Sequence, residues 1–399
     1  SSDICMCFLF LLSFLAFLGV YCKYLALFIF IKVNDKLTNY SDLRTVTFSV
    51  NLVVDNLKKM TTIKQVAEHS GVSVATVSRA LQHPDKVAKK TREKIIHSVK
   101  LLDYKPNLLA VKFRSGKSHN IIVLVPTIAN LFFARVIAGM QEAAMKQGYS
   151  ILLANTLANP STESEYAKMV QTSQADGLIQ LRAFNPFTQT DAQSIGFLPM
   201  VNVCEVLDDI NCPTVALNNQ AASKTMTDYL ISIGHKRIGL VKGPQSSPLT
   251  LARLAGYREA LANANIPFDE ELLFSGDFTL KAGRLAGQRI LECKQRPTAV
   301  FCENDETAIG AIQAFKQAGL RVPQDISVAG FDDIAFAGFC DPPLTTISQP
   351  AEDFGRTAVN LLIDLITEKK SKQTRVTMPF ELILRQSTQA IDPNNFSAE

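Results

Sequence analysis

Short apolar runs alternate with helix-like stretches from Ile121 onward, and this alternation limits the possible folds more than any other feature of the sequence. The runs IIVLVP, ILLAN, GLIQL and PMVNV have the length and the continuous hydrophobicity of buried parallel strands. The amphipathic stretch Leu131–Gln147, which Gly148 ends, predicts a helix between the first two runs. The pattern starts again with RIGLVKG, LLFSG, TAVFC and DISVAGF. Alternation of this kind predicts an α/β fold of doubly wound layers, and two successive sets predict two lobes.

A small basic segment precedes this mildly acidic body. Residues 60–118 contain twelve Lys or Arg and four Asp or Glu, a net charge of +8, whereas residues 119–399 have a net charge of −6. A phosphate-binding head joined to a separate soluble domain would show this asymmetry, and so would an exposed charged helix. A chain of 399 residues is long enough for two or three domains.

The first 59 residues contain a nearly unbroken apolar stretch from Phe8 to Ile31, interrupted mainly by Lys23. That length can span a bilayer, and the basic residues after it would keep the rest of the chain in the cytoplasm. The alternative is that residues 1–59 are translated upstream sequence and that Met60 is the natural start. A secretory signal fits less well, because export would separate the basic segment from any DNA that it binds.

The stretch TTIKQVAEHSGVSVATVSRALQ, residues 61–82, predicts two short helices joined by a tight turn. Thr62 and Gln65 have the spacing of a capping box, in which each side chain bonds the other residue's backbone N–H. Gly71 accepts the left-handed conformation of the turn, and Ser73 caps the second helix. That helix exposes small, polar and basic groups near its start, as a recognition helix does in the major groove. The alternative is a generic helical hairpin.

A third helix, about residues 90–102, completes the predicted three-helix head. Its apolar residues Ile95, Ile96, Val99 and Leu102 are expected to face the core, together with Val77, Ala80 and Leu81 of the second helix. The residues of the head predicted to bind DNA are Thr62, Ser73, Val74, Ala75, Thr76, Ser78 and Arg79.

No catalytic motif of the GxSxG, HExxH or GxxxxGK[ST] type is present, and the five cysteines after the leader form no CxxC pair. The sequence therefore predicts a binding protein with no metal or cofactor rather than an enzyme. Ligands of doubly wound sheets bind outside the carboxyl ends of the strands. The candidates at those ends are Asn130 to Phe133, Cys204-Glu205, Arg253, Phe278, Asn304-Asp305 and Asp332-Asp333.

The segments VAEHSGVSVATVSRAL, TREKI and Tyr104-Lys105-Pro106-Asn107 resemble the head of the lactose-repressor family of bacterial regulators, and the similarity continues to about Ile391. The resemblance implies a DNA-binding head at 60–105, a hinge helix and linker at 106–118, an effector-binding and dimerisation domain at 119–391, and a tail at 392–399. It also implies that the hinge helix inserts a side chain into the minor groove. The DNA-binding residues implied there are Asn107, Ala110 and Phe113.

Phe113 stands at the wedge position of that hinge, where the family usually has Leu. Apolar wedges that kink DNA include Phe as well as Leu, so the substitution is compatible with insertion. The alternative is that Phe113 is a linker residue that packs against the body.

The loop motifs GPQSSPLTLARLAGY, GDF, AVFCENDETAIGAI and CDPPLTTISQP are most similar to cytidine-responsive members of the family, and purine-responsive members share several of them. By position, Arg253 and Asp332 would hold the hydroxyl groups of a cytidine-like nucleoside, and phenylalanines would pack against its ring. Asp305 would lie with Asn304 at the wall of the site. The implied effector-binding residues are Phe132, Phe133, Arg253, Phe278, Asn304 and Asp332.

Three positions depart from other branches of the family. Cys204 stands where sugar- and purine-responsive members often have Asp, which weakens any transfer of sugar recognition. Ser247 and Leu249 stand where the purine-responsive type has polar or charged groups, which argues against a purine base.

Each candidate also has a structural alternative. Phe132 and Phe278 could be core aromatics, Arg253 a surface ion pair, and Asp332 a helix-capping carboxylate.

Two functions follow. The first is a homodimeric, cytoplasmic and nucleoid-associated repressor that binds a palindromic operator and responds to the nucleoside. The cyclic-AMP receptor protein is a candidate further partner by the same resemblance. The second is a membrane-tethered or exported solute receptor of a transporter. The basic helix-turn-helix distinguishes them, because an exported receptor has no use for it.

Overall fold

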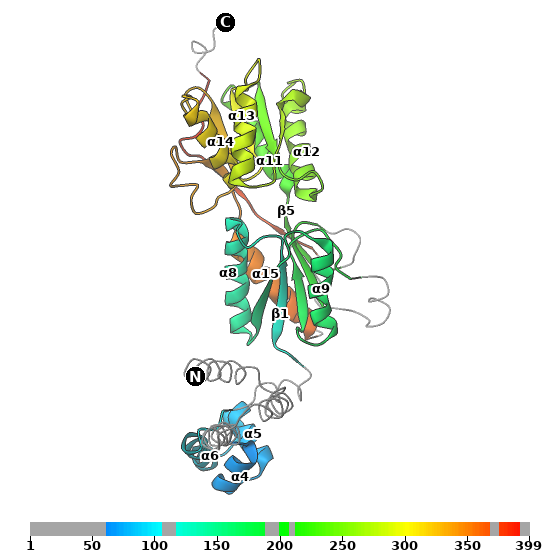
Figure 1. Cartoon of the computed structure of the whole chain (residues 1–399), viewed down its shortest axis with the longest axis vertical. Coiled ribbons are helices and arrows are strands. Elements are labelled where there is room, and N and C mark those ends of the chain that lie inside the picture. The colour runs from blue at the N-terminus through cyan, green and yellow to red at the C-terminus, as the bar shows by residue number, and fades with distance from the viewer. Residues whose placement is uncertain (1–60, 106–116, 188–198, 207–211, 368–374, 392–399) are drawn as a thin grey trace, which may run out of the picture. The chain divides into compact units, whose positions relative to one another are not determined.

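The computed structural model describes residues 61–105, 117–187, 199–206, 212–367 and 375–391. These residues divide into two compact units, the head at 61–105 and the body from 117 onward (Figure 1). The leader, the tail and the predicted hinge contacts Asn107, Ala110 and Phe113 lie outside the described residues. Within the described ranges, no helix has both the length and the apolar character needed to cross a membrane.

The head is a three-helix unit, as predicted. It contains α4 (Ile63–Ser70), α5 (Val74–Gln82), a short 3-10 turn (Pro84–Lys86) and α6 (Lys89–Leu101). Thr62 and Gln65 form the predicted capping box, and the Ser73 hydroxyl accepts a hydrogen bond from the Thr76 N–H at the start of α5. Gly71 adopts φ +68° between the two helices, which explains why the turn requires glycine.

Val66, Val77 and Ile95 are fully buried at the centre of the head. The prediction for Ile96 was wrong, because 42% of this residue is exposed. α6 turns Ser98 toward the core instead, where its hydroxyl lies 2.9 Å from Nδ1 of His69 and donates to the Lys94 carbonyl. Residues 95, 98, 99 and 102 thus form the inner face of α6, at the spacing of a helical stripe.

The first lobe of the body contains a six-stranded sheet in the order β11-β5-β4-β3-β1-β2, with every pairing parallel. Helices α8 (Leu131–Lys146) and α15 (Ala351–Ile366) cover one face, and α9 (Pro160–Gln171) covers the other (Figure 1). The strands are β1 (Asn120–Val125), β2 (Ser150–Asn155), β3 (Gly177–Gln180), β4 (Met200–Cys204), β5 (Thr214–Leu217) and β11 (Arg375–Met378).

The second lobe repeats this arrangement in the order β12-β10-β9-β8-β6-β7, and only β12 is antiparallel to its neighbour. Its helices pack in two pairs, α11 (Asn219–Ser232) with α12 (Pro248–Asn263) and α13 (Leu280–Leu291) with α14 (Asp305–Gln317). The strands are β6 (Ile238–Lys242), β7 (Leu273–Ser275), β8 (Ala299–Cys302), β9 (Ser327–Asp332), β10 (Thr345–Ser348) and β12 (Glu381–Ile383).

The chain crosses between the lobes three times. β5 ends in the first lobe and α11 begins in the second, β10 leads back to α15 in the first lobe, and β11 and β12 belong to different sheets. The two predicted lobes are therefore confirmed, but they are not two consecutive halves of the chain. Hydrophobic periodicity identifies strands without assigning them to a sheet, so it could not reveal these crossings.

Candidate functional site

Several non-glycine residues with positive φ lie at or just past the carboxyl ends of strands of the body, among them Leu157 and Ala158 after β2 and four of the predicted candidates. Cys204 has φ +72° at the end of β4, Phe278 has φ +68° after β7, and Asp332 and Asp333 have φ +110° and +55° at the end of β9. Such conformations are costly for residues with a Cβ and concentrate at functional sites. These four candidates lie at the carboxyl ends of β4, β7 and β9.

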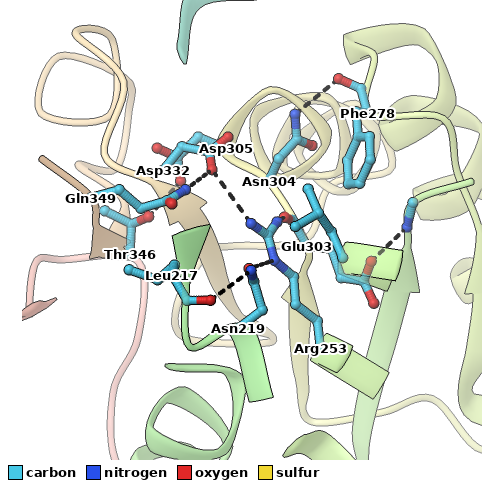
Figure 2. A network of polar contacts seen from close by, with 12 residues as sticks. Leu217, Asn219, Arg253, Phe278, Glu303, Asn304, Asp305, Asp332, Thr346 and Gln349 are labelled. Atoms are coloured by element: carbon cyan, nitrogen blue, oxygen red, sulfur yellow. Dashed lines mark hydrogen bonds and ion pairs between the residues drawn. The ribbon is translucent and has the colours of Figure 1, made fainter. Parts of the chain in front are cut away.

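Arg253 lies at the centre of a buried polar network on α12 (Figure 2). Its Nε donates to the Asn219 Oδ1 at 2.9 Å, and its Nη1 donates to the main-chain carbonyl of Glu303. The guanidinium carbon lies 3.6 Å from the centre of the Phe331 ring. Only 3% of the residue is exposed, so the alternative of a surface ion pair is wrong.

Asp332 faces this guanidinium, with Oδ1 4.0 Å from Arg253 Nη2. The Gln349 amide donates to the same Oδ1 at 2.7 Å, while Oδ2 accepts no hydrogen bond from the described residues. Asp332 caps none of the described helices, so that alternative is also wrong. Burial raises the pKa of Asp332 to about 7, against the opposing effects of Arg253 and Gln349.

Arg253 Nη2 and Asp332 Oδ2 therefore offer a donor and an acceptor that the described part of the chain does not satisfy. An ionised carboxylate accepts hydrogen bonds only, and a guanidinium donates them only. This pair can bind two hydroxyl groups of a small molecule at once.

Asn304 and Asp305 lie in the predicted place, but their polar groups are already occupied. Asn304 caps α14, accepting from the Thr307 N–H through Oδ1 and donating to the Phe278 carbonyl through Nδ2 at 2.9 Å. Asp305 accepts from the Thr346 hydroxyl and from the Ile334 N–H. We therefore assign these two residues a positioning role, holding α14 and the loop of Phe278.

The ring of Phe278 packs directly against Gly243, just past the end of β6. A Cβ at Gly243 would lie 2.0 Å from Cζ of Phe278, so only glycine allows this contact. Phe278 is half-buried, and it therefore keeps an exposed part that another ring could contact.

Phe132 is a core aromatic, as its alternative interpretation stated. It is 6% exposed, and its ring packs edge-on against Phe354 of α15 at 6.1 Å. Phe133 packs against the same core but keeps partial exposure, which makes it the better ligand contact of the two.

Glu303 was not among the predicted binding residues, although it directly follows β8. It is 1% exposed, and its Oε2 accepts a hydrogen bond from the Gly243 N–H at 2.8 Å. Burial raises its pKa to about 7. The sequence signal for Glu303 was its position directly after the apolar run AVFC. Burying a carboxylate there costs free energy unless the group is paired or hydrogen-bonded.

The two lobes contact one another through three hydrogen bonds beside this network. The Ser247 hydroxyl donates to Glu205 at 2.6 Å, the Leu131 N–H donates to Glu306 at 3.2 Å, and Nη1 of Arg135 donates to the Asp333 carbonyl at 3.0 Å. Cys204 lies close enough to Asp332 and Arg253 for their charges to affect its pKa. The network on the second lobe therefore lies against the first, and a ligand there could contact both.

In the head, several of the residues predicted to read DNA lie at the surface. Ala75 and Arg79 of α5 are exposed, as are Thr62 and Ser73. Thr76 and Ser78 are half-buried. Val74 is also half-buried and packs partly against the core of the head, so it offers less surface to DNA than Ala75 or Arg79 does. The DNA contacts themselves stay a prediction.

Replacing Arg79 with alanine is expected to lower operator affinity by about 1–3 kcal/mol if its guanidinium reads a base. Arg79→Lys keeps the charge but loses the bidentate fork, so it should lose sequence discrimination while retaining non-specific DNA binding. Electrophoretic mobility or anisotropy titrations on operator and scrambled DNA measure both effects. Equal losses on both DNAs for Arg79→Lys would show that the residue contacts phosphate only.

Comparison with known proteins connects these two parts of the chain. Residues 62–107 match the profile of bacterial regulatory proteins of the lacI family, and residues 227–388 match a periplasmic binding protein-like domain. The HTH-type transcriptional repressor CytR of Escherichia coli K12 is 39% identical over 330 residues, covering 83% of this chain and 97% of that protein. The chain belongs to the lacI family.

Two further lacI-family relatives support this assignment. The repressor PurR of Photobacterium profundum is 33% identical over 334 residues and is covered completely. The lac repressor dimer bound to operator and the anti-inducer ONPF has a TM-score of 0.74 at 28% identity, covering 83% of this chain and all of that one. The chain is therefore a DNA-binding transcriptional repressor and not an enzyme, and the solute-receptor alternative is set aside.

Proposed function

We propose that this lacI-family repressor acts as a homodimer in the cytoplasm, and that a ribonucleoside, cytidine first, controls its affinity for operator DNA. The observation that carries the proposal is the pair of Arg253 Nη2 and Asp332 Oδ2, which keep hydrogen-bonding capacity for a ligand. The half-buried ring of Phe278 belongs to the same region of the lobe, where Asn304 holds its backbone carbonyl (Figure 2). A ribose has adjacent hydroxyls for the pair, and a base has a flat face for the ring.

The resemblance to CytR supports a nucleoside, and the resemblance to PurR keeps a purine as the second candidate. The mechanism is a coupling free energy between two sites. A ligand that binds one arrangement of the lobes more tightly shifts the population toward it. The three hydrogen bonds between the lobes are the contacts that such a shift would break or keep.

The proposal also includes the domain limits of 60–105 for the head, 106–118 for the hinge helix and linker, and 119–391 for the effector-binding domain. It further includes the cyclic-AMP receptor protein as a partner at the operator.

The test is the loss of one hydroxyl from the ligand. Cytidine should bind more tightly than 2′-deoxycytidine by about 1–3 kcal/mol, since the deoxy compound leaves a buried acceptor unpaired. Asp332→Asn should remove most of that difference. Because the pKa of Asp332 is about 7, cytidine affinity should also rise from pH 6 to pH 8 as the carboxylate ionises. Titration calorimetry measures all three effects.

Asp228→Asn is the matched control, because Asp228 forms a partly exposed ion pair with Lys224 on α11. It should leave both affinities unchanged. Binding of guanine or galactose without any response to cytidine would overturn the effector assignment while leaving the repressor assignment intact.

A further inference from the structure

Two carboxylates connect the lobes of the body in a reciprocal arrangement. Glu205 of the first lobe accepts a hydrogen bond at 2.6 Å from the hydroxyl of Ser247, the N-cap residue of α12 in the second lobe. Glu306, in the first turn of α14 in the second lobe, accepts one at 3.2 Å from the N–H of Leu131, the first residue of α8 in the first lobe. Each lobe thus places a carboxylate at the start of a helix of the other lobe (Figure 1), where the helix dipole favours negative charge.

Glu205 is fixed to its own lobe by two further hydrogen bonds. Its second carboxylate oxygen accepts from the Ala183 N–H at 2.6 Å, and the Asn202 amide donates to its main-chain carbonyl. The residue is buried, and a buried carboxylate is costly unless it is hydrogen-bonded. Because one of its two side-chain partners belongs to the second lobe, separating the lobes at this point would remove a charge-assisted hydrogen bond.

Both cross-lobe contacts involve elements that carry or adjoin the pair proposed to bind the ligand. Ser247 caps α12, and Arg253 lies further along the same helix. Glu306 lies close enough to Asp332 to raise the pKa of that carboxyl group, although burial has the larger effect. Movement of the lobes at either contact would therefore move one member of the pair relative to the first lobe.

We propose that Glu205 is a positioning residue for the effector site, which acts through Ser247 to hold α12 against the first lobe. With Glu306 it favours the arrangement of the lobes in which a ligand on the second lobe can contact both. The part of this inference that concerns the effector rests on the nucleoside function proposed above. Without the contact, part of the binding free energy of the ligand is used to bring the lobes together, so its affinity falls.

Cys204 gives a measure of the lobe arrangement that needs no ligand. It directly precedes Glu205 at the end of β4 and is buried. Burial raises the pKa of its thiol, as do Glu205 and Asp332, whereas Arg253 lowers it, so the thiol lies close to residues of both lobes. We expect it to react with an alkylating reagent when the lobes separate. Cys302 is fully buried at the end of β8 within the second lobe and should react only when that lobe unfolds.

The experiment exchanges donor and acceptor across the contact in the full chain. Ser247→Asp keeps a good helix cap but places a second carboxylate opposite Glu205. Alkylation of Cys204, followed by peptide mass spectrometry, should become about tenfold faster, and cytidine should bind about tenfold more weakly, as expected for one lost charge-assisted hydrogen bond. Adding Glu205→Gln supplies an amide donor to the new carboxylate, while the amide oxygen can still accept from the Ala183 N–H. In the double variant, both quantities should return close to their wild-type values.

Ser247→Gly is the milder variant, because glycine is a tolerated cap and only the hydroxyl donor is lost. It should speed Cys204 alkylation several-fold, and it decides the matter if Ser247→Asp also exposes Cys302. Unchanged Cys204 alkylation in both folded variants, or a double variant as reactive as Ser247→Asp, would overturn the proposal. So would a double variant that protects Cys204 again without recovering cytidine affinity. If the alkylation results hold but the wild-type chain binds no cytidine, the nucleoside function falls and the role of Glu205 in holding the lobes stands.

Discussion

Replacing Arg253 with methionine is expected to abolish effector binding and to destabilise the body. The variant loses the donor to the ligand, the bonds to Asn219 and to the Glu303 carbonyl, and the stack on Phe331. Removing one partner of a buried ion pair typically costs about 3–5 kcal/mol of unfolding free energy. Effector affinity should fall about a hundredfold or more, since truncating one member of a buried charged pair costs about 2–5 kcal/mol of binding. Chemical denaturation and calorimetry measure the two quantities separately.

The loss of stability in Arg253→Met should be largest at alkaline pH. Arg253 lowers the pKa of both Glu303 and Asp332. In Arg253→Met both carboxyl groups are therefore protonated and uncharged at pH 6, where burying them costs little free energy. As the pH rises they ionise without the guanidinium beside them, and the cost of burying them increases. Arg258→Met is the matched control on the same helix, because Arg258 is exposed and stacks on Phe268 at 4.4 Å. A stable Arg253→Met protein with unchanged effector affinity would contradict the network described above.

Glu303→Gln is expected to stabilise the protein at pH 8 and to have little effect at pH 5. The pKa of Glu303 rises from an ordinary 4.5 to about 7 on folding, so between these values the folded state holds a proton that the unfolded state has lost. Stability therefore falls as the pH rises through this window. At about 1.4 kcal/mol per pKa unit, the wild-type protein gives up about 3 kcal/mol by pH 8.

The glutamine variant removes this penalty, because its amide is neutral and its oxygen can still accept from the Gly243 N–H. Denaturation midpoints from pH 5 to pH 8 should converge at the acidic end and separate at the alkaline end. Asp228→Asn on the surface should show no such separation. A gain that is the same at pH 5 and pH 8 would mean that Glu303 is not the titrating group.

The sequence predicts well the elements whose signals are local. The capping box of Thr62 and Gln65 and the left-handed Gly71 define the head, and continuous apolar runs define β1 to β4 and β6 to β9. The short strands β5, β10, β11 and β12 were not predicted, because each mixes polar with apolar side chains and none stands in a longer continuous apolar run. Ile96 was misplaced because neighbouring apolar residues on a helix cannot all face one core.

The site was predictable to the level of strand ends but not of individual contacts. Arg253 and Asp332 were identified by position, yet only the fold shows that both are buried and that each keeps an unsatisfied polar group. Asn304 proved to be a helix cap, and Phe132 a core residue. Glu303 was missed because a single carboxylate after an apolar run gives no sign of its partners until β6 and α12 are placed beside it.

The central claim is that one chain couples a nucleoside site to an operator site, and operator affinity with and without cytidine tests it most directly. The DNA is the duplex that the chain itself selects from a random pool, bound by the full chain and by residues 60–399 at fixed salt, because DNA affinity depends strongly on salt. A coupling of about 1–3 kcal/mol predicts that saturating cytidine changes operator affinity about 5- to 150-fold. The account predicts that both forms show this change and that Asp332→Asn shows it only at much higher cytidine. Operator binding that is tight but identical with and without cytidine, at concentrations shown by calorimetry to fill the site, would contradict it.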